Sequence, residues 1–282
     1  MNKSIRQFIH DWVPPMAIRV IRSVLAAVRP AAFEFISYEW PKNIQLKGWQ
    51  ANSVADVRNK AWGKFLCSME GKLPFGISED DFLSPRHMKM DAQNLYLSYG
   101  YCLGLACYDK QVLKVLDWGG ATADYYVVSK KMMPAIRFEY SCAELPLVCV
   151  VGQKLLPEVT FYDTDTWQNM HFDFVFSSSA LQYLEDWRTT VRALIQSSNQ
   201  YLYITRMPFV ITGRSFVMLQ RVKEYGTEYL GWVINRHEFL QFVEQHGMKL
   251  IREFVNHLGP QIKGAPEQNI YMGFLFEKQE HK

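Results

Sequence analysis

The stretch KVLDWGGATADYY, residues 114–126, decides the fold. Its first half is an apolar run typical of a buried strand, and the run stops at the acid Asp117. Gly119 and Gly120 then permit a sharp turn, because glycine adopts backbone conformations that other residues avoid. The following residues restart as a helix, whose free N–H groups face the turn. This order predicts a strand–turn–helix unit that either holds a ligand or serves as a plain structural turn.

Composition limits the classes of protein that fit the chain. Of its 282 residues 49% are hydrophobic, and 31 basic against 28 acidic side chains give a net charge of +3. A nucleic-acid-binding protein usually shows a concentrated basic face, so we expect no nucleic-acid partner. The five cysteines match neither a zinc ligand set nor a CxxC pair. An odd number of cysteines without a signal peptide predicts a cytoplasmic protein.

One apolar segment near the N-terminus is a candidate for contact with a membrane. Residues 16–28, MAIRVIRSVLAAV, are too short to span a bilayer and are interrupted by Arg19 and Arg22. As a basic amphipathic helix, the segment could make a peripheral contact with a membrane surface. Packing against its own domain is the alternative.

The remaining pattern predicts a two-part chain. Residues 1–109 look mainly helical, with a longer helix over 88–107, and residues 110–282 alternate short apolar runs with amphipathic stretches. We therefore predict an α/β fold with a doubly wound, mostly parallel seven-stranded sheet whose final strand is antiparallel, preceded by a helical N-terminal region. The strands are expected at 112–116, 137–141, 159–162, 172–176, 201–205, 249–254 and 270–276, with a helix at 236–246 before the last two.

Acidic residues follow the first three predicted strands, at the edge where ligands of such sheets bind. Glu144 comes 27 positions after Asp117, a separation that suits an acid holding the ribose hydroxyls of a nucleotide-like ligand. The alternative role of Glu144 is to favour the start of a helix opened by Pro146. After the third strand, Asp163 and Asp165 are candidates for an adenine amino group or for capping a turn.

These acids suit a cationic ligand better than a dinucleotide, and the sulfonium of S-adenosyl-L-methionine (SAM) is such a cation. Gly119 and Gly120 are adjacent, and Ala121 and Ala123 stand where a dinucleotide fingerprint has glycine. The lack of a recognisable Tyr-Lys catalytic pair also disfavours an NAD-dependent oxidoreductase.

VLDWGGATADYY (115–126) and FDFVFSSSALQYLEDW (172–187) resemble the first and fourth-strand motifs of class I SAM-dependent methyltransferases. Together with residues 229–254 they resemble a family of methyltransferases encoded among bacterial surface-polysaccharide genes. The resemblance covers most of the chain from about residue 88 and implies SAM as cofactor. It assigns Glu144 to the ribose, Asp163 or Asp165 to the adenine and Ser178 to the rim near the sulfonium, and it lines the methionine part with Asp117, Gly119, Gly120 and Ala121.

One departure from the family concerns the end of the glycine turn. The family usually has glycine where this chain has Ala123. The substitution is expected either to shift the loop slightly or to weaken cofactor binding.

The loops after the fourth and fifth strands point at the methyl group in this topology, which makes Tyr183, Asp186 and Arg206 the catalytic candidates. Asp186 is the first candidate for a general base, with His237 as a weaker alternative. The alternative role of Asp186 is to cap a helix. Arg206 would hold an anionic acceptor or pair with a local acid. No cluster has clear metal-ligand spacing, so we predict no metal.

The segment 209–232 looks like a long aromatic-rich loop that forms a partial lid over the acceptor, with ordinary core packing as the alternative. Its aromatic residues Tyr225, Tyr229 and Trp232 are candidates for stacking on a sugar ring. The sequence and the resemblance together predict a SAM-dependent methyltransferase. Oxygen of a sugar or glycan precursor is the expected acceptor, which rests on the surface-polysaccharide context of the resembling family. Methylation of another small molecule and a non-catalytic methyltransferase-like subunit are the alternatives, and the oligomeric state stays open.

Overall fold

A computed structural model of the chain describes residues 30–44, 46, 48–50, 52–77 and 90–279. Every helix and strand below lies in the unit Phe33–Lys282. The basic segment 16–28, for which the sequence suggested a membrane contact, lies outside the described residues.

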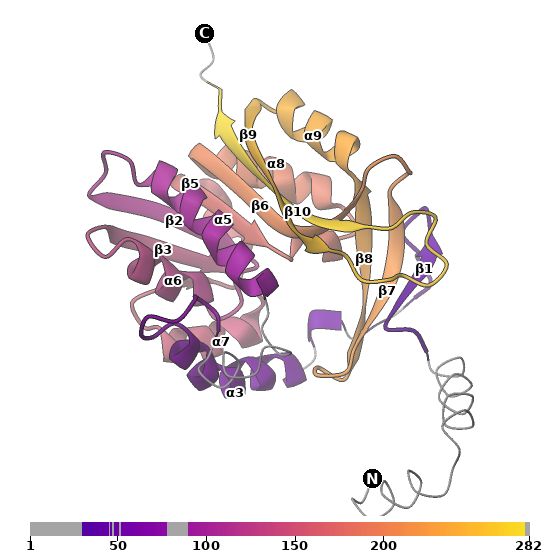
Figure 1. Cartoon of the computed structure of the whole chain (residues 1–282), viewed down its shortest axis with the longest axis horizontal. Coiled ribbons are helices and arrows are strands. Elements are labelled where there is room, and N and C mark those ends of the chain that lie inside the picture. The colour runs from indigo at the N-terminus through magenta and orange to yellow at the C-terminus, as the bar shows by residue number, and fades with distance from the viewer. Residues whose placement is uncertain (1–29, 45, 47, 51, 78–89, 280–282) are drawn as a thin grey trace, which may run out of the picture. The chain divides into compact units, whose positions relative to one another are not determined.

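Seven strands form a mostly parallel sheet (Figure 1). They are β2 (Val112–Trp118), β3 (Arg137–Ala143), β4 (Thr160–Tyr162), β5 (Phe172–Ser178), β6 (Ser198–Val210), β9 (Met248–Leu258) and β10 (Ile270–Lys278). Their order across the sheet is β4-β3-β2-β5-β6-β10-β9, and β10 runs antiparallel to both of its neighbours. Each predicted strand is present, and the Rossmann-like α/β fold expected from the sequence is confirmed.

Helices cover both faces of this sheet, as Figure 1 shows for α5 on one face and α8 on the other. The helices are α3 (Asn52–Ser68), α5 (Met90–Ala106), α6 (Asp124–Met132), α7 (Pro146–Leu155), α8 (Trp187–Ser197) and α9 (Arg236–Gln245). Because side chains alternate along a strand, Phe174 and Phe176 pack under α5 while Val175 packs under α8. This alternation builds two separate apolar cores.

Local sequence determines where several helices begin. Asp186 caps α8 by accepting a hydrogen bond from the Thr189 N–H, and Asn235 caps α9 by accepting one from the Glu238 N–H. Pro146 opens α7, because its fixed φ suits the first helical position. The glycine at 247 follows α9 with a φ of 89°, which ends the helix.

A smaller antiparallel group of strands extends the sheet. β1 (Phe33–Ser37) pairs with β7 (Phe216–Val222), and β7 pairs with β8 (Thr227–Asn235). The end of β8 then joins β6 in parallel, so all ten strands form one sheet.

The β7–β8 hairpin corrects one expectation from the sequence. Residues 209–232 are strand ends and a hairpin rather than a long loop, because β6 continues to Val210 and Gly226 (φ 61°) supports the turn between β7 and β8. Besides the helices α3 and α5, the described part of residues 1–109 contributes the strand β1 to the sheet. The side chains of β1 pack against the hairpin. The local sequence of β1 does not reveal this packing.

The strand order reverses at β2. From β2 the chain adds β3 and β4 on one side, and later adds β5 and β6 on the other. The carboxyl end of β2 is therefore the point where a crevice opens in sheets of this type.

Two global observations complete the fold. Among the described helices, none combines the length and the apolar character needed to cross a membrane. The five cysteines are free thiols, and four of them are buried.

Candidate functional site

Several residues of the turn after β2 have positive φ values, a backbone conformation that residues with a side chain rarely adopt. Gly119 has a φ of 70°, and Ala121 and Ala123 have φ values of 52° and 59°. The Gly119 N–H donates to the carbonyl of Ala143 on β3 at 2.8 Å. A Cβ at Gly119 would stand 2.3 Å from the Cβ of Ala180, so the glycine is required by space as well as by φ.

Ala123 keeps the turn despite replacing the glycine that the resembling family has. It is fully buried and takes the left-handed conformation as the residue before α6. A residue with a Cβ in this conformation costs roughly 1–2 kcal/mol. Thus the chain accommodates the departure through strain at Ala123.

Asp117 lies beneath the turn rather than on a cavity wall. Its side chain is fully buried and accepts a hydrogen bond from the Tyr140 hydroxyl at 2.9 Å. Burial raises the pKa of the Asp117 carboxyl to about 8. A Cβ at Gly120 would stand 2.3 Å from Cγ of Asp117, so these two residues fit together as the floor of the turn.

Glu144 ties the turn to the next strand. One carboxylate oxygen accepts from the N–H of Ala121 at 3.0 Å, and the other accepts from the N–H of Leu145 at 2.9 Å. Burial raises the pKa of the Glu144 carboxyl above its usual value, and these two hydrogen bonds oppose the shift. A carboxylate has further lone pairs, so Glu144 retains the capacity to accept from a ligand.

A cavity of about 950 Å³ opens beside this turn. We call it the principal cavity. Of the cofactor-binding and catalytic candidates from the sequence, it is lined by Gly119, Ala121, Glu144, Asp163, Asp165, Ser178, Tyr183 and Arg206. Asp117, Gly120 and Asp186 are not among its lining residues.

Acidic side chains form one wall of the principal cavity. Glu144 directly follows β3, while Asp163 and Asp165 follow β4 and are exposed. We call these three residues the acidic wall. All of them can accept hydrogen bonds from hydroxyl or amino groups.

Aromatic side chains form a second wall. This aromatic wall consists of Trp49, Tyr183, Tyr225 and Tyr271. The ring centroids of Trp49 and Tyr183 lie 4.9 Å apart, and the Tyr183 hydroxyl donates to Oε1 of Gln220 at 2.9 Å. The hydrogen bond joins η4 (Leu181–Tyr183) to β7, so the hairpin is part of the cavity.

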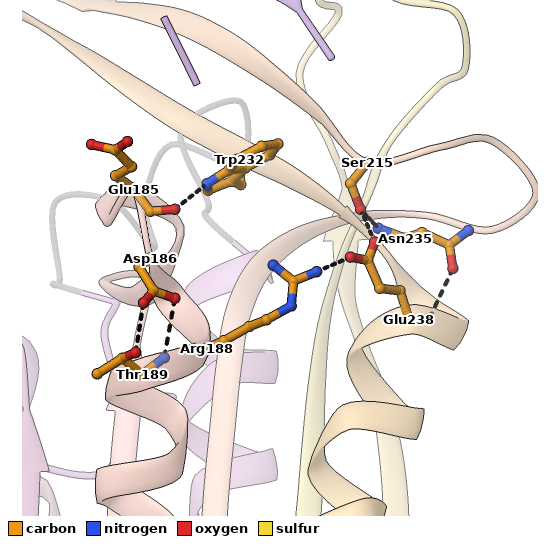
Figure 2. A network of polar contacts seen from close by, with 8 residues as sticks. All are labelled: Glu185, Asp186, Arg188, Thr189, Ser215, Trp232, Asn235 and Glu238. Atoms are coloured by element: carbon orange, nitrogen blue, oxygen red, sulfur yellow. Dashed lines mark hydrogen bonds and ion pairs between the residues drawn. The ribbon is translucent and has the colours of Figure 1, made fainter. Parts of the chain in front are cut away.

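Asp186 does not act at this cavity. Its side chain is exposed and accepts from Thr189, through the backbone N–H at 3.2 Å and through the hydroxyl at 2.5 Å, as Figure 2 shows. These hydrogen bonds hold the pKa of Asp186 below its usual value. Asp186 therefore has the capping role that the sequence left as its alternative.

The hairpin is anchored by the polar network of Figure 2. Glu238 of α9 forms an ion pair with Arg188 of α8 and accepts a hydrogen bond from the Ser215 hydroxyl. The Asn235 N–H donates to Ser215 Oγ at 2.8 Å. The network thus links the start of β7 to the helices behind the sheet.

The aromatic residues expected in a lid divide into different environments. Tyr225 lines the principal cavity, whereas Tyr229 is buried and stacks on Trp49 with ring centroids 4.2 Å apart. Trp232 faces a second cavity of about 480 Å³, and its indole N–H donates to the Glu185 carbonyl at 3.1 Å.

Several lining residues lie outside the candidates that the sequence offered. Trp49 and Arg58 come from the N-terminal region, whose packing against the sheet leaves no local signal. His257 and Tyr271 line the cavity from β9 and β10. Here a signal existed, because the carboxyl end of the predicted strand 249–254 lies at the same edge as the other parallel strands.

No group of three His, Cys, Asp or Glu residues in the described ranges could hold a metal ion. The cavity instead offers carboxylates, aromatic rings and the arginines Arg58 and Arg206. Such a lining fits an organic ligand with hydroxyl, amino and ring groups.

No known family model matches the sequence. The curated proteins contain no match either. Solved structures do resemble the fold. Magnesium protoporphyrin IX methyltransferase from Synechocystis PCC 6803, with bound SAM, is 12% identical and has a TM-score of 0.48, covering 85% of this chain and 100% of its own. The 1,6-didemethyltoxoflavin-N1-methyltransferase of Burkholderia thailandensis, with bound S-adenosylhomocysteine, is 10% identical and has a TM-score of 0.49, covering 89% and 97%.

Proposed function

We propose that the protein is a SAM-dependent methyltransferase. The observation that carries the proposal is the position of Glu144, which fixes the Ala121 turn from β3 and also lines the cavity at the point where the strand order reverses. A carboxylate at this place accepts from ribose hydroxyls, while the turn leaves its backbone open to the rest of the ligand.

The residues present fit SAM. The acidic wall supplies acceptors for the ribose hydroxyls at Glu144 and for the adenine amino group at Asp163 or Asp165. Gly119 and Ala121 border the part of the cavity nearest the turn, where the methionine end would lie. A volume of about 950 Å³ is at the upper end of the range of about 300–1,000 Å³ for small-molecule sites, which leaves room for an acceptor as well.

The chain's own contribution to the reaction is placement. SAM supplies an electrophilic methyl group, so the protein has to align the acceptor and exclude water. The aromatic wall lies across the cavity edge formed by η4 and β7, and its rings exclude water from one side of the acceptor. Tyr183 is held by Gln220 and acts as a positioning residue for that wall.

We further propose a sugar or glycan precursor as the acceptor, methylated on oxygen. Aromatic side chains with polar tips, such as Tyr225 and Tyr271, suit a ring that has one apolar face and several hydroxyl groups. The surface-polysaccharide context of the resembling family supports the same choice. A cytoplasmic location would agree with a precursor as substrate.

Calorimetry with SAM and S-adenosylhomocysteine tests the proposal. We expect binding to the native protein at about micromolar Kd, and a loss of about tenfold or more in Glu144→Ala, because the ribose acceptor is removed. Asp186→Ala serves as the matched acidic control and should bind like the native protein. Absence of binding to the native protein would overturn the cofactor assignment. Release of S-adenosylhomocysteine during incubation with SAM and an acceptor separates an enzyme from a non-catalytic subunit.

A further inference from the structure

Arg206 sits at an irregularity of β6 that turns it toward the principal cavity. Thr205 and Arg206 together face the single residue Gly273 of β10, because the pairing register shifts there. Arg206 has a φ of 56°, a left-handed conformation within a strand. Such a conformation is unfavourable for a residue with a side chain, and strain of this kind gathers at functional sites.

Neighbouring residues hold this irregularity in place. Oδ1 of the buried Asn256 accepts from the Arg206 N–H and from the Thr205 hydroxyl, each at 3.2 Å. A Cβ at Gly273 would stand 2.4 Å from the Thr205 hydroxyl oxygen, so the glycine makes room for the bulge. The unusual backbone of Arg206 is thus supported from β9 and from β10.

The Arg206 side chain brings a positive charge with no partner among the residues that the structure describes. It is exposed, lines the principal cavity and forms neither an ion pair nor a side-chain hydrogen bond with those residues. Arg58, the other arginine that lines the cavity, forms an ion pair with Asp124, with 3.8 Å between Nη1 and Oδ2. The guanidinium of Arg206 is therefore available to a ligand.

The acidic wall and Arg206 belong to different ends of the cavity. Glu144 directly follows β3 and Arg206 lies on β6, and the sheet order places β2 and β5 between these strands. Three strand spacings amount to about 14 Å. The end with the carboxylates suits the nucleoside, so the end with Arg206 faces the second ligand.

His257 adds a second polar group at the Arg206 end. Its ring stacks on Tyr271 with centroids 4.6 Å apart and an interplanar angle of 18°. Nδ1 lies 2.8 Å from the Leu258 carbonyl oxygen, which requires the hydrogen on Nδ1 and leaves Nε2 for a ligand. In the strand pairing, Tyr271 faces both His257 and Pro208, which is two residues from Arg206.

We propose that Arg206 binds an anionic group, a carboxylate or a phosphate, on the acceptor, with His257 facing a neighbouring hydroxyl. The proposal rests on the methyltransferase function proposed above, because it assigns this end of the cavity to the acceptor. Guanidinium binds carboxylate and phosphate through paired, charge-assisted hydrogen bonds. The acceptor class is accordingly an acidic sugar or a sugar phosphate.

The experiment measures binding of D-glucuronate, D-glucose 1-phosphate and D-glucose by calorimetry, with and without saturating S-adenosylhomocysteine. We expect at least one acidic probe to bind about ten- to a hundredfold more tightly than D-glucose, because charge-assisted hydrogen bonds are strong. The two acidic probes distinguish a carboxylate from a phosphate. Arg206→Gln should abolish the preference and leave the affinity for S-adenosylhomocysteine unchanged.

Arg214→Gln is the matched control, since Arg214 lies at the second cavity with its guanidinium over the Tyr38 ring. It should keep the preference for the acidic probes. Equal loss in both variants would reduce the effect to net charge and overturn the proposal. Weaker S-adenosylhomocysteine binding in Arg206→Gln would assign the guanidinium to the cofactor instead, and no preference in the native protein would also reject the site. Failure of the native protein to bind S-adenosylhomocysteine would count against the proposed function. The titrations of the acidic probes without S-adenosylhomocysteine would still test the anion site.

Discussion

The carboxyl group of Asp117 lies directly beneath Gly120, so close that a Cβ on the glycine would stand 2.3 Å from its Cγ. The pair explains why the turn after β2 needs a glycine at a position that does not touch the cavity. It also gives Asp117 a structural role under the loop, where Tyr140 donates to it from β3. The stability of the turn and the charge of a buried acid are therefore linked.

Gly120→Ala should lower the free energy of unfolding by about 1–3 kcal/mol, because the new methyl group overlaps the buried carboxyl group. Gly63→Ala is the control: Gly63 lies within α3, a Cβ there meets no atom within 4 Å, and the change should stabilise the helix by up to about 1 kcal/mol. Urea unfolding of both variants measures the difference. Equal stabilities for the two variants would contradict the close fit.

Stability should fall as pH rises across the range in which Asp117 titrates. The folded protein keeps the Asp117 proton up to a pKa of about 8, whereas the unfolded chain loses it near 3.8. The folded state thus binds more protons between these values, and the free energy of unfolding decreases with pH until it levels above about 8. Asp117→Asn removes this titration. The thermal midpoint of the variant should therefore rise relative to that of the native protein as the pH increases from about 5 to about 8. If the difference between the two thermal midpoints does not change with pH, Asp117 is not buried as a neutral acid.

Asp186→Ala should cost about 1 kcal/mol of stability through loss of the α8 cap. Asp186→Ser should restore most of that loss, because a serine hydroxyl also accepts from the Thr189 N–H. Neither variant should change the rate of methyl transfer, since Asp186 does not line the principal cavity. Chemical unfolding and a turnover assay are needed together. A large fall in turnover with unchanged stability would return Asp186 to the catalytic site.

Arg206→Gly should leave the free energy of unfolding unchanged or raise it by up to about 1 kcal/mol. Glycine relieves the strain at a φ of 56°, although it also increases the freedom of the unfolded chain. Arg206→Val should be less stable than the native protein by about 1–2 kcal/mol, because a branched side chain fits this conformation poorly. Thermal unfolding distinguishes the two. A marked loss of stability in the glycine variant would mean that Arg206 is kept for packing.

The strands of the central sheet were predictable because their signal is local. Each is a short apolar run next to a turn, and β2, β5 and β6 begin or end within a few residues of the expected positions. The position of Glu144 on the cavity was also predictable, since its spacing from Asp117 reflects one strand–helix–strand unit. The position of Asp117 below the turn could not be predicted, because the direction of a side chain at a strand end depends on its neighbours in space.

The hairpin and the N-terminal contributions could not be predicted in the same way. The sequence of β7 and β8 is rich in aromatic residues and reads equally as a long loop, and only the pairing with β1 shows how its faces are covered. Trp49 reaches the cavity by stacking on Tyr229, a contact between residues far apart in the chain. Asp186 offered two roles of equal standing, and its hydrogen bonds to Thr189 decide between them.

The pairing of β8 with the end of β6 has a consequence for ligand binding. A loop that folds over a ligand must lose its conformational freedom at each encounter, whereas a strand hydrogen-bonded to the core lost that freedom when the protein folded. The hairpin side of the cavity is thus already formed before a ligand arrives. A ligand on that side therefore meets strands that are already paired, so ordering those strands is not part of its binding cost.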